Sequence, residues 1–312
     1  MSKREYLIAS PPYVHFCGGI NVLHKLCHML NERGEKAYIT GGVMNPDYNT
    51  ISVNTLSQEH LRDLQHNGII VLPDIVPFNP VRFTNVVRWW LGGIQEQRPN
   101  QLTFRFSDTF DPLNTTDNKM SVDIIEDFFI PPEVENRKGV CAYSGKGQGM
   151  VTAPVPETGH FDDPNPNCYK IVPGNPPTRR ELAKIFQEKE VFYCYDTATI
   201  LVQEARKCGC PVIMCGEHMF SKEVFRTSEY GQHGLGWYDE NPDIEELRKQ
   251  LHLFEIDYQK KQEAIEKELD TFIEMSQAWN PEGIYVEDLD PAGQYLHTLF
   301  GHTNFELFVT RG

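Results

Sequence analysis

Short apolar segments alternate with segments of helical periodicity along the first part of the chain. An apolar stretch at Tyr6–Ala9 precedes a helical pattern from Val22 to Glu32, and Gly34 is expected to end that helix. Lys36–Thr40 has the pattern of the next strand. A strand, a helix and a strand in this order predict a β-α-β unit and therefore parallel strands. Further strands are expected at Ile69–Leu72, Asn85–Trp89 and Gln101–Phe106.

A second series follows a connector at Phe129–Gly139, which is rich in Pro and charge and poor in periodic apolar residues. The alternation predicts an α/β protein of two Rossmann-like domains, 1–137 and 138–284, each with a parallel sheet and helices on its faces. The expected elements are strands at Val140–Tyr143, Tyr169–Val172, Val191–Tyr195 and Pro211–Cys215, a helix capped by Thr178, and a helix over Ile200–Lys207.

The end of the chain has a different pattern. From Asp243 to about Ala278 it is dense in charge, with Leu247, Leu251 and Phe254 on one apolar helical face. The last segment, 285–312, is apolar around Tyr295 to Phe308, and we expect it to pack back on the N-terminal domain.

Composition restricts the classes of partner. The chain of 312 residues has 44 acidic and 29 basic residues, a formal charge of −15. This excess argues against general affinity for nucleic acid or anionic lipid, because both depend on basic residues. No stretch approaches the roughly 20 apolar residues of a transmembrane segment, and the start lacks a signal-peptide pattern, so we expect a cytoplasmic protein. The eight cysteines fit buried free thiols, since Cys208-Gly-Cys210 lacks the paired spacing of a zinc site.

Two glycine-containing turns are candidate phosphate sites. Gly18 and Gly19 lie between a strand and a helix, where glycines let the backbone approach a phosphate. In "YSGKGQG", Lys146 stands among glycines that include Gly145, and it could neutralise a diphosphate. Neither turn is a GxGxxG fingerprint or a Walker loop, and a tight turn or a solvated loop is the alternative for each.

Two acids flank a third turn. Asp196 ends an apolar strand, where parallel α/β sheets bind ligands, and Glu204 stands eight positions later in the following helix. Glu204 could accept hydrogen bonds from two neighbouring ribose hydroxyls. The alternative is that Asp196 only caps the helix and that Glu204 is a solvated helix residue. The turn between strand and helix, whose amides would face the same crevice, is formed by Thr197, Ala198 and Thr199.

These motifs resemble those of one family. "YDTATILVQEARKCGCPV" is similar to the segment of retaining glycosyltransferases of the GT-B fold, family 4-like, that carries two acids separated by seven residues and then continues Glu-Ala, Gly, a small residue and Pro-Val. The family more often has Glu where this chain has Asp196. "CGGINVLHKLCHMLNERGEKAYI" resembles the first loop, helix and strand of the same family, and "YSGKG" matches the place of a basic residue on the diphosphate.

The resemblance implies two Rossmann-like domains that face each other across a cleft. It implies transfer of a sugar from a nucleotide diphosphate-sugar donor to a hydroxyl of a glycan, lipid-linked or small-molecule acceptor, with retention at the anomeric carbon and without metal or cofactor. Lys146 and helix amides would stabilise the leaving diphosphate. The implied catalytic residues are Lys146, Asp196 and Glu204, and the implied donor contacts are Gly18, Gly19, Gly145, Lys146, Thr197, Ala198, Thr199 and Glu204.

Other functions remain as alternatives. A nucleotide-sugar epimerase of the same architecture would turn over its donor without an acceptor, and a non-catalytic sugar-nucleotide binding protein would bind it without turnover. A nicotinamide oxidoreductase is disfavoured by the missing glycine fingerprint. A metal-dependent transferase of the other common fold would need Asp-x-Asp at a strand end, and the pairs Asp162/Asp163 and Asp108/Asp111 are turn-like or wrongly spaced.

Overall fold

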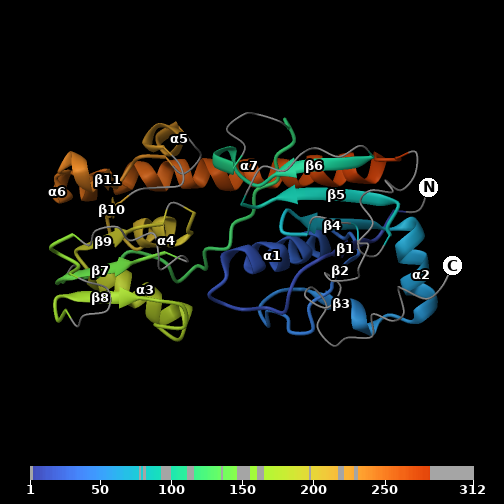
Figure 1. Cartoon of the computed structure of the whole chain (residues 1–312), viewed down its shortest axis with the longest axis horizontal. Helices are drawn as coiled ribbons and strands as arrows, with labels where there is room; N and C mark the ends of the chain where they lie inside the picture. Colours follow the sequence, from blue (N-terminus) through green and yellow to red (C-terminus); the bar gives the residue numbers. More distant parts are fainter. Residues whose placement is uncertain are drawn as a thin grey trace. The chain divides into compact units, whose positions relative to one another are not determined.

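The chain forms two compact units, each with its own parallel sheet (Figure 1). Among the described residues, the first unit combines those up to Ile124 with those from Ala264 to 281, and the second unit lies within Ile125–Glu263. The prediction of two α/β, Rossmann-like domains is confirmed. The computed structural model describes residues 3–76, 79, 82–92, 100–110, 116–134, 136–145, 155–159, 165–196, 198–216, 221–227 and 231–281.

The first unit contains a six-stranded sheet in the order β3-β2-β1-β4-β5-β6. All its strand pairs are parallel, and the order reverses between β1 and β4. The strands are β1 Tyr6–Ile8, β2 Ala37–Ile39, β3 Ile51–Ser52, β4 Ile69–Pro73, β5 Asn85–Trp90 and β6 Gln101–Arg105, and the helices are α1 Gly18–Glu32 and α2 Gln58–Asn67, with single 3-10 turns at Val53–Thr55 and Asp108–Phe110.

Helix α1 packs on β1 and β2 and begins earlier than its apolar pattern predicts (Figure 1). It starts at Gly18 rather than Val22, because Asn21 fixes the preceding loop by donating from Nδ2 to the backbone oxygens of His15 and Cys17, both at 3.1 Å. The helix ends before Gly34, as predicted. Helix α2 was not predicted, because it buries only Leu61 and Leu64. The short strand β3 was not predicted either.

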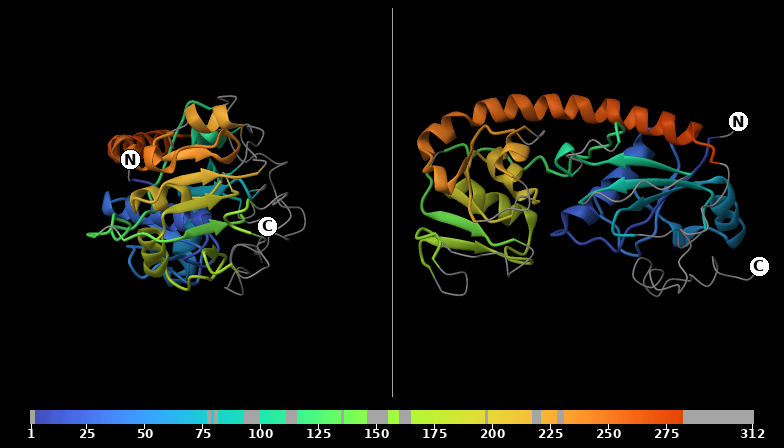
Figure 2. Two further views of the ribbon diagram at one scale, coloured as in Figure 1. Left: turned by 90° about the vertical axis from the view of Figure 1, so that its left-hand side faces the viewer. Right: turned by 45° about the horizontal axis from the view of Figure 1, so that its top comes forward.

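The second unit contains a five-stranded parallel sheet in the order β11-β10-β9-β7-β8. Its arrows point the same way in the left view of Figure 2, so the carboxyl ends of the strands lie at one edge. The elements are β7 Val140–Tyr143, β8 Cys168–Ile171, α3 Arg179–Glu188, β9 Val191–Cys194, α4 Leu201–Lys207, β10 Val212–Met214, α5 Lys222–Thr227, β11 Leu235–Trp237, a 3-10 turn Tyr238–Glu240, α6 Ile244–Lys249 and α7 Leu251–Ala278.

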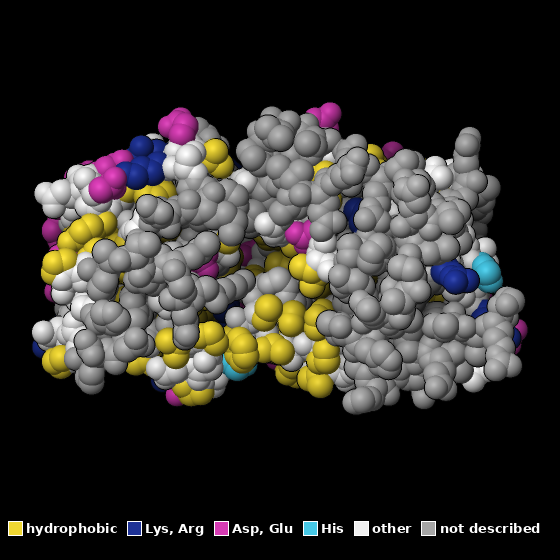
Figure 3. All heavy atoms as spheres, viewed as in Figure 1, with side chains coloured by type: hydrophobic (Ala, Val, Ile, Leu, Met, Phe, Trp, Pro, Cys, Tyr) yellow, Lys and Arg dark blue, Asp and Glu magenta, His cyan; other side chains and the backbone are white. Residues whose placement is uncertain are grey.

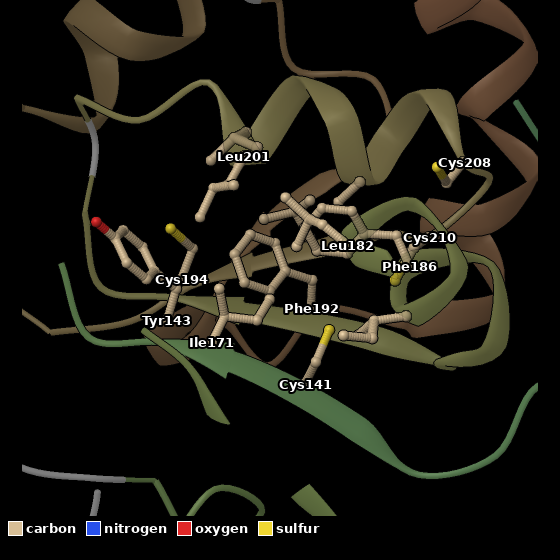
Figure 4. Packing of buried hydrophobic residues seen from close by; sticks show 14 of the residues in the cluster. Cys141, Tyr143, Ile171, Leu182, Phe186, Phe192, Cys194, Leu201, Cys208 and Cys210 are labelled. Carbon is tan, nitrogen blue, oxygen red and sulfur yellow. The ribbon is translucent and has the colours of Figure 1, made fainter. Parts of the chain in front are cut away.

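Helices α3 and α4 cover one core of this unit. Figure 4 shows Leu201 of α4 directed toward the strand layer that carries Phe192 and Cys194. The ring of Phe192 lies 5.1 Å from that of Phe186, centroid to centroid. All eight cysteines of the chain are free thiols and seven are buried, as the sequence indicated. Burial raises the pKa of Cys194 well above its usual range, so this thiol is a packing group rather than a nucleophile.

The predicted connector at Phe129–Gly139 belongs to the second unit, and the units divide at Ile124/Ile125 instead of after residue 137. Phe129 is fully buried in the core of the second unit. Arg137 donates to the backbone oxygens of Phe186 and Cys208, both at 2.7 Å. One buried aromatic and one cation therefore fasten a segment whose Pro and charge content suggested an exposed linker.

Helix α7 contributes to the first unit from Ala264 on. Phe272 is fully buried, with ring centroids 4.8 Å from Phe104 and 6.2 Å from Tyr6. The hydroxyl groups of Ser276 and Tyr6 lie 2.8 Å apart. The return to the first unit thus begins inside a helix. The segment 285–312, for which packing on the N-terminal domain was predicted, lies outside the described residues.

Candidate functional site

Two of the predicted site residues meet at the carboxyl edge of the second sheet. Strands β7 and β9 are parallel neighbours, and the nitrogen of Tyr195 donates to the oxygen of Tyr143 at 3.0 Å. Gly145 follows β7 and Asp196 follows β9. A Cβ atom placed on Gly145 would lie 3.2 Å from the Cβ of Asp196. The sheet order reverses between these two strands, and this is the point at which open parallel sheets bind ligands.

Asp196 is half-buried and stabilises the turn that leads into α4. Its Oδ1 accepts a hydrogen bond from the nitrogen of Ala198 at 2.8 Å, and Thr199 Oγ1 accepts one from the nitrogen of Leu201 at 3.3 Å. The helix begins after Ile200 without a side-chain cap, so the alternative that Asp196 merely caps α4 is wrong. Thr197 lies outside the described residues.

Glu204, in the first turn of α4, is fully buried. The alternative that it is a solvated helix residue is therefore also wrong. Its Oε1 accepts a hydrogen bond from Nη2 of Arg179 at 2.5 Å. A carboxylate at this depth is stable only when a charged partner compensates for the lost hydration, and Arg179 is that partner.

The guanidinium of Arg179 joins Glu204 to a second acid, Glu126. Nε donates to both carboxylate oxygens of Glu126 at 2.8 Å, and Nη2 donates to Oε2 at 2.6 Å. The guanidinium also lies 5.0 Å from the ring centroid of Phe129. Burial tends to lower the pKa of Arg179, but the charges and hydrogen bonds of Glu204 and Glu126 outweigh it and raise this pKa. This network was not predicted, because its local signal in the sequence is a single arginine after the predicted cap Thr178.

Substitution of Gly145 by alanine should destabilise the second unit more than the same change at Gly174. Both glycines have positive φ, +95° and +80°, which costs an L-residue about 1–2 kcal/mol. A Cβ at Gly174 meets nothing within 4 Å, whereas one at Gly145 meets Asp196. Urea unfolding measures the loss in free energy of unfolding for each variant, and the difference between the two losses reports the steric effect of Asp196. Equal losses would show that the turn adjusts to the added Cβ without strain.

The remaining predicted residues are divided between the units. Gly18 and Gly19 are the first residues of α1, after β1 in the first unit. A Cβ on Gly19 would meet nothing within 4 Å, and one on Gly18 would meet only Ile124 Cδ1, at 3.9 Å. Neither position has positive φ, so internal packing does not require glycine at either one. Lys146 lies outside the described residues.

The described residues offer no metal centre. No group of three or more His, Cys, Asp or Glu side chains among them is arranged to hold a metal ion. Asp108, one of the acids weighed for such a role, accepts from Arg105 at 2.9 Å and from Lys119 at 2.8 Å. These ion pairs hold its pKa below the usual range although burial opposes them. Asp111, Asp162 and Asp163 lie outside the described residues.

Basic side chains on the described surface are largely matched by acids. Figure 3 shows acidic and basic side chains side by side in the region of α5. Lys222 donates to Asp239 at 2.5 Å, and Arg226 donates to Glu240 at 2.5 Å. A surface paired in this way does not provide the excess of cations that binding of a polyanion requires. No helix in the described part of the chain is long and apolar enough to span a bilayer.

No protein-family model matches the chain, and no curated protein matches its sequence. Among solved structures, the chain is similar to CalG4, the calicheamicin glycosyltransferase, at TM-score 0.44 and 12% identity, with 89% of this chain and 98% of that chain covered. It is similar to the glycosyltransferase SnogD from Streptomyces nogalater at TM-score 0.41 and 11% identity, with 96% and 100% covered. For a mutant of the T4 phage BGT in complex with UDP-glucose, the values are 0.39 and 11%, with 96% and 100% covered. These TM-scores lie below 0.5 and the identities are 11–12%, so the likeness does not assign an activity to this chain.

Proposed function

We propose that the protein is a GT-B-type, retaining glycosyltransferase that moves a sugar from a nucleotide diphosphate-sugar to an acceptor hydroxyl. The observation that carries the proposal is the close approach of Gly145 to Asp196, 3.2 Å from a Cβ placed on the glycine, at the point where the order of the second sheet reverses. An acid beside a glycine turn at such a point suits a ligand with both hydroxyls and phosphates. The two-acid segment that contains Asp196 and Glu204 is the one whose pattern resembles this family.

Each residue then has a distinct role. Asp196 accepts hydrogen bonds from hydroxyls of the transferred sugar, and Lys146 stabilises the departing diphosphate as its charge grows. Glu204 accepts hydrogen bonds from the ribose hydroxyls. Since Glu204 is fully buried in the structure, the ribose reaches it only after a local rearrangement at the start of α4. Gly18 and Gly19, at which internal packing does not require glycine, lie beside the donor phosphate in this proposal.

Retention fixes the face of the sugar on which the new bond forms. The bond between the anomeric carbon and the diphosphate oxygen breaks, and the bond to the acceptor oxygen forms on the same face of the sugar. The acceptor proton passes to the leaving diphosphate, so no other acid is needed. The class of acceptor is a hydroxyl-bearing glycan, lipid-linked sugar or small molecule.

A thermal-shift panel with UDP-, GDP-, ADP- and dTDP-sugars tests this function. We expect one base to stabilise the chain, by about 2.7 kcal/mol when the donor is present at about a hundred times its dissociation constant. The absence of a shift with every donor would contradict the proposal. Consumption of the donor without acceptor would indicate the epimerase, and binding without turnover on any pooled hydroxyl acceptor would indicate the binding protein.

The variant Asp196→Ala separates contacts with the sugar from contacts with the nucleotide. Intact donor should bind more weakly to this variant, while the free nucleotide diphosphate should bind as it does to the parent protein. The reason is that Asp196 is assigned to the sugar hydroxyls alone. Isothermal titration with both ligands measures the difference, and an equal loss for both would move Asp196 to the nucleotide.

A further inference from the structure

The guanidinium of Arg179 binds two carboxylates that come from distant parts of the second unit. It reaches Glu126, near the start of the unit, through three donor–acceptor distances of 2.8, 2.8 and 2.6 Å. It reaches Glu204 on α4 through one, at 2.5 Å. Glu126 therefore determines where the planar guanidinium lies, and the guanidinium determines where Oε1 of Glu204 lies.

Burial increases along this series of groups. The side chain of Glu126 is 33% exposed, that of Arg179 is 12% exposed and that of Glu204 is 0% exposed. A carboxylate buried to this degree would take up a proton if its cation were removed. Among the described residues, Arg179 is the cation that pairs with Glu204 and favours its ionised form.

The charge state of Glu204 determines what it can bind. An ionised carboxylate only accepts hydrogen bonds, whereas a protonated one also donates. One guanidinium and two carboxylates leave a net negative charge on the network, which favours hydroxyl donors and disfavours phosphate. The network therefore suits the ribose, and the phosphates belong elsewhere in the site.

We propose that Arg179 is a positioning residue for donor binding, which keeps the carboxylate of Glu204 ionised so that it accepts the ribose hydroxyls once the start of α4 has rearranged to admit them. This rests on the proposed function and adds to it a residue outside the two-acid segment. Glu126 acts indirectly, because its carboxylate holds the guanidinium of Arg179 in place. Among the described residues, Cys208 at the end of α4 also interacts electrostatically with Glu204, and its pKa is raised first by burial and then by the charges of Cys210 and Glu204.

Isothermal titration with the nucleoside diphosphates UDP, GDP, ADP and dTDP tests the role at about pH 6 and about pH 8.5. Arg179→Ala should raise the dissociation constant of the nucleoside diphosphate that the parent binds by about ten- to hundred-fold. This is the effect expected from the loss of a charge-assisted hydrogen bond. The ratio of variant to parent dissociation constant should be larger at the lower pH, because a buried carboxylate without its cation takes up a proton more readily. Using the ratio cancels the titration of the nucleotide phosphate itself.

Two further variants guard against a simple failure to fold. Arg179→Lys keeps the positive charge but lacks the planar guanidinium with its several N–H donors. Compared with Arg179→Ala, it should bind the nucleotide with an affinity that depends less on pH, but it should recover only part of the parent's affinity. Glu126→Gln keeps the cation at Glu204 and loosens its anchor, and should weaken binding less than Arg179→Ala. Arg180→Ala is the matched control, since the Arg180 guanidinium lies over the Phe128 ring at 4.4 Å, and it should bind like the parent.

The outcomes distinguish the two proposals. If the parent binds none of the four nucleoside diphosphates, the proposed function and the role of Arg179 both fall. If the parent binds one of them and both Arg179→Lys and Glu126→Gln match it at each pH, only the role of Arg179 falls. A loss of affinity in Arg179→Ala that does not change with pH would also overturn it, because a purely structural defect has no reason to follow the protonation of Glu204.

Discussion

Replacing Glu204 by alanine should lower the free energy of unfolding by about 3 kcal/mol. The change removes a fully buried anion and leaves the guanidinium of Arg179 with Glu126 as its remaining acid. Loss of one partner from a buried ion pair costs about 3–5 kcal/mol, and the retained partner places this case at the low end. Urea unfolding followed by circular dichroism measures it.

Glu255→Ala is the matched control for that change. Glu255 lies in α7 and its side chain is 42% exposed. Its carboxylate pairs at 2.9 Å with Lys207 of α4, the helix that also carries Glu204. Exposed pairs contribute about 0–1 kcal/mol, so this variant should unfold almost like the parent. If Glu204→Ala and Glu255→Ala lower the free energy of unfolding equally, the buried ion pair of Glu204 with Arg179 does not stabilise the second unit.

Replacing Phe272 by alanine should cost about 3–5 kcal/mol, the range for emptying a fully buried aromatic site. Phe272 belongs to the part of α7 that packs into the first unit, against Phe104 and Tyr6. The expected loss arises because strands β1 and β6 fix the opposing rings and the cavity cannot collapse. Urea or thermal unfolding of the full chain measures it.

Thr271→Ala serves as the comparison for Phe272, one residue earlier in the same helix. Thr271 is exposed, and its hydroxyl donates to the backbone oxygen of Lys267 at 3.0 Å. Changes of this kind usually remain within about 0.5 kcal/mol. An equally small effect for Phe272→Ala would mean that the last turns of α7 are not part of the core of the first unit.

The strands could be predicted because a strand buried on both faces has a local signature. Val140–Tyr143 is a strand with the predicted bounds, and Val191–Cys194 and Ile69–Pro73 differ from their predictions by one residue. Continuous apolar runs bounded by turns carry this information without reference to the rest of the chain. Helix α2 could not be found in this way, because two buried leucines do not establish a period.

The site was partly determined by the same local logic. Parallel strands bring the loops that follow them to one edge of the sheet, so the sequence predicted that Gly145 and Asp196 lie at that edge. Their close approach could not be predicted in this way, because it depends on β7 and β9 being neighbours while β8 lies on the other side of β7. Strand order is a property of the folded sheet, and no single segment encodes it.

The sequence by itself determined two α/β units, their parallel strands and the two acids that flank the turn before α4. Tertiary structure alone decided that Glu204 is buried, that Arg179 joins it to Glu126, and that α7 returns to the first unit at Ala264. Arg179 lies 25 positions from Glu204 and 53 positions from Glu126 along the chain. Apolar periodicity reports which face of an element is covered, whereas the partner of a buried charge depends on which distant segment covers it.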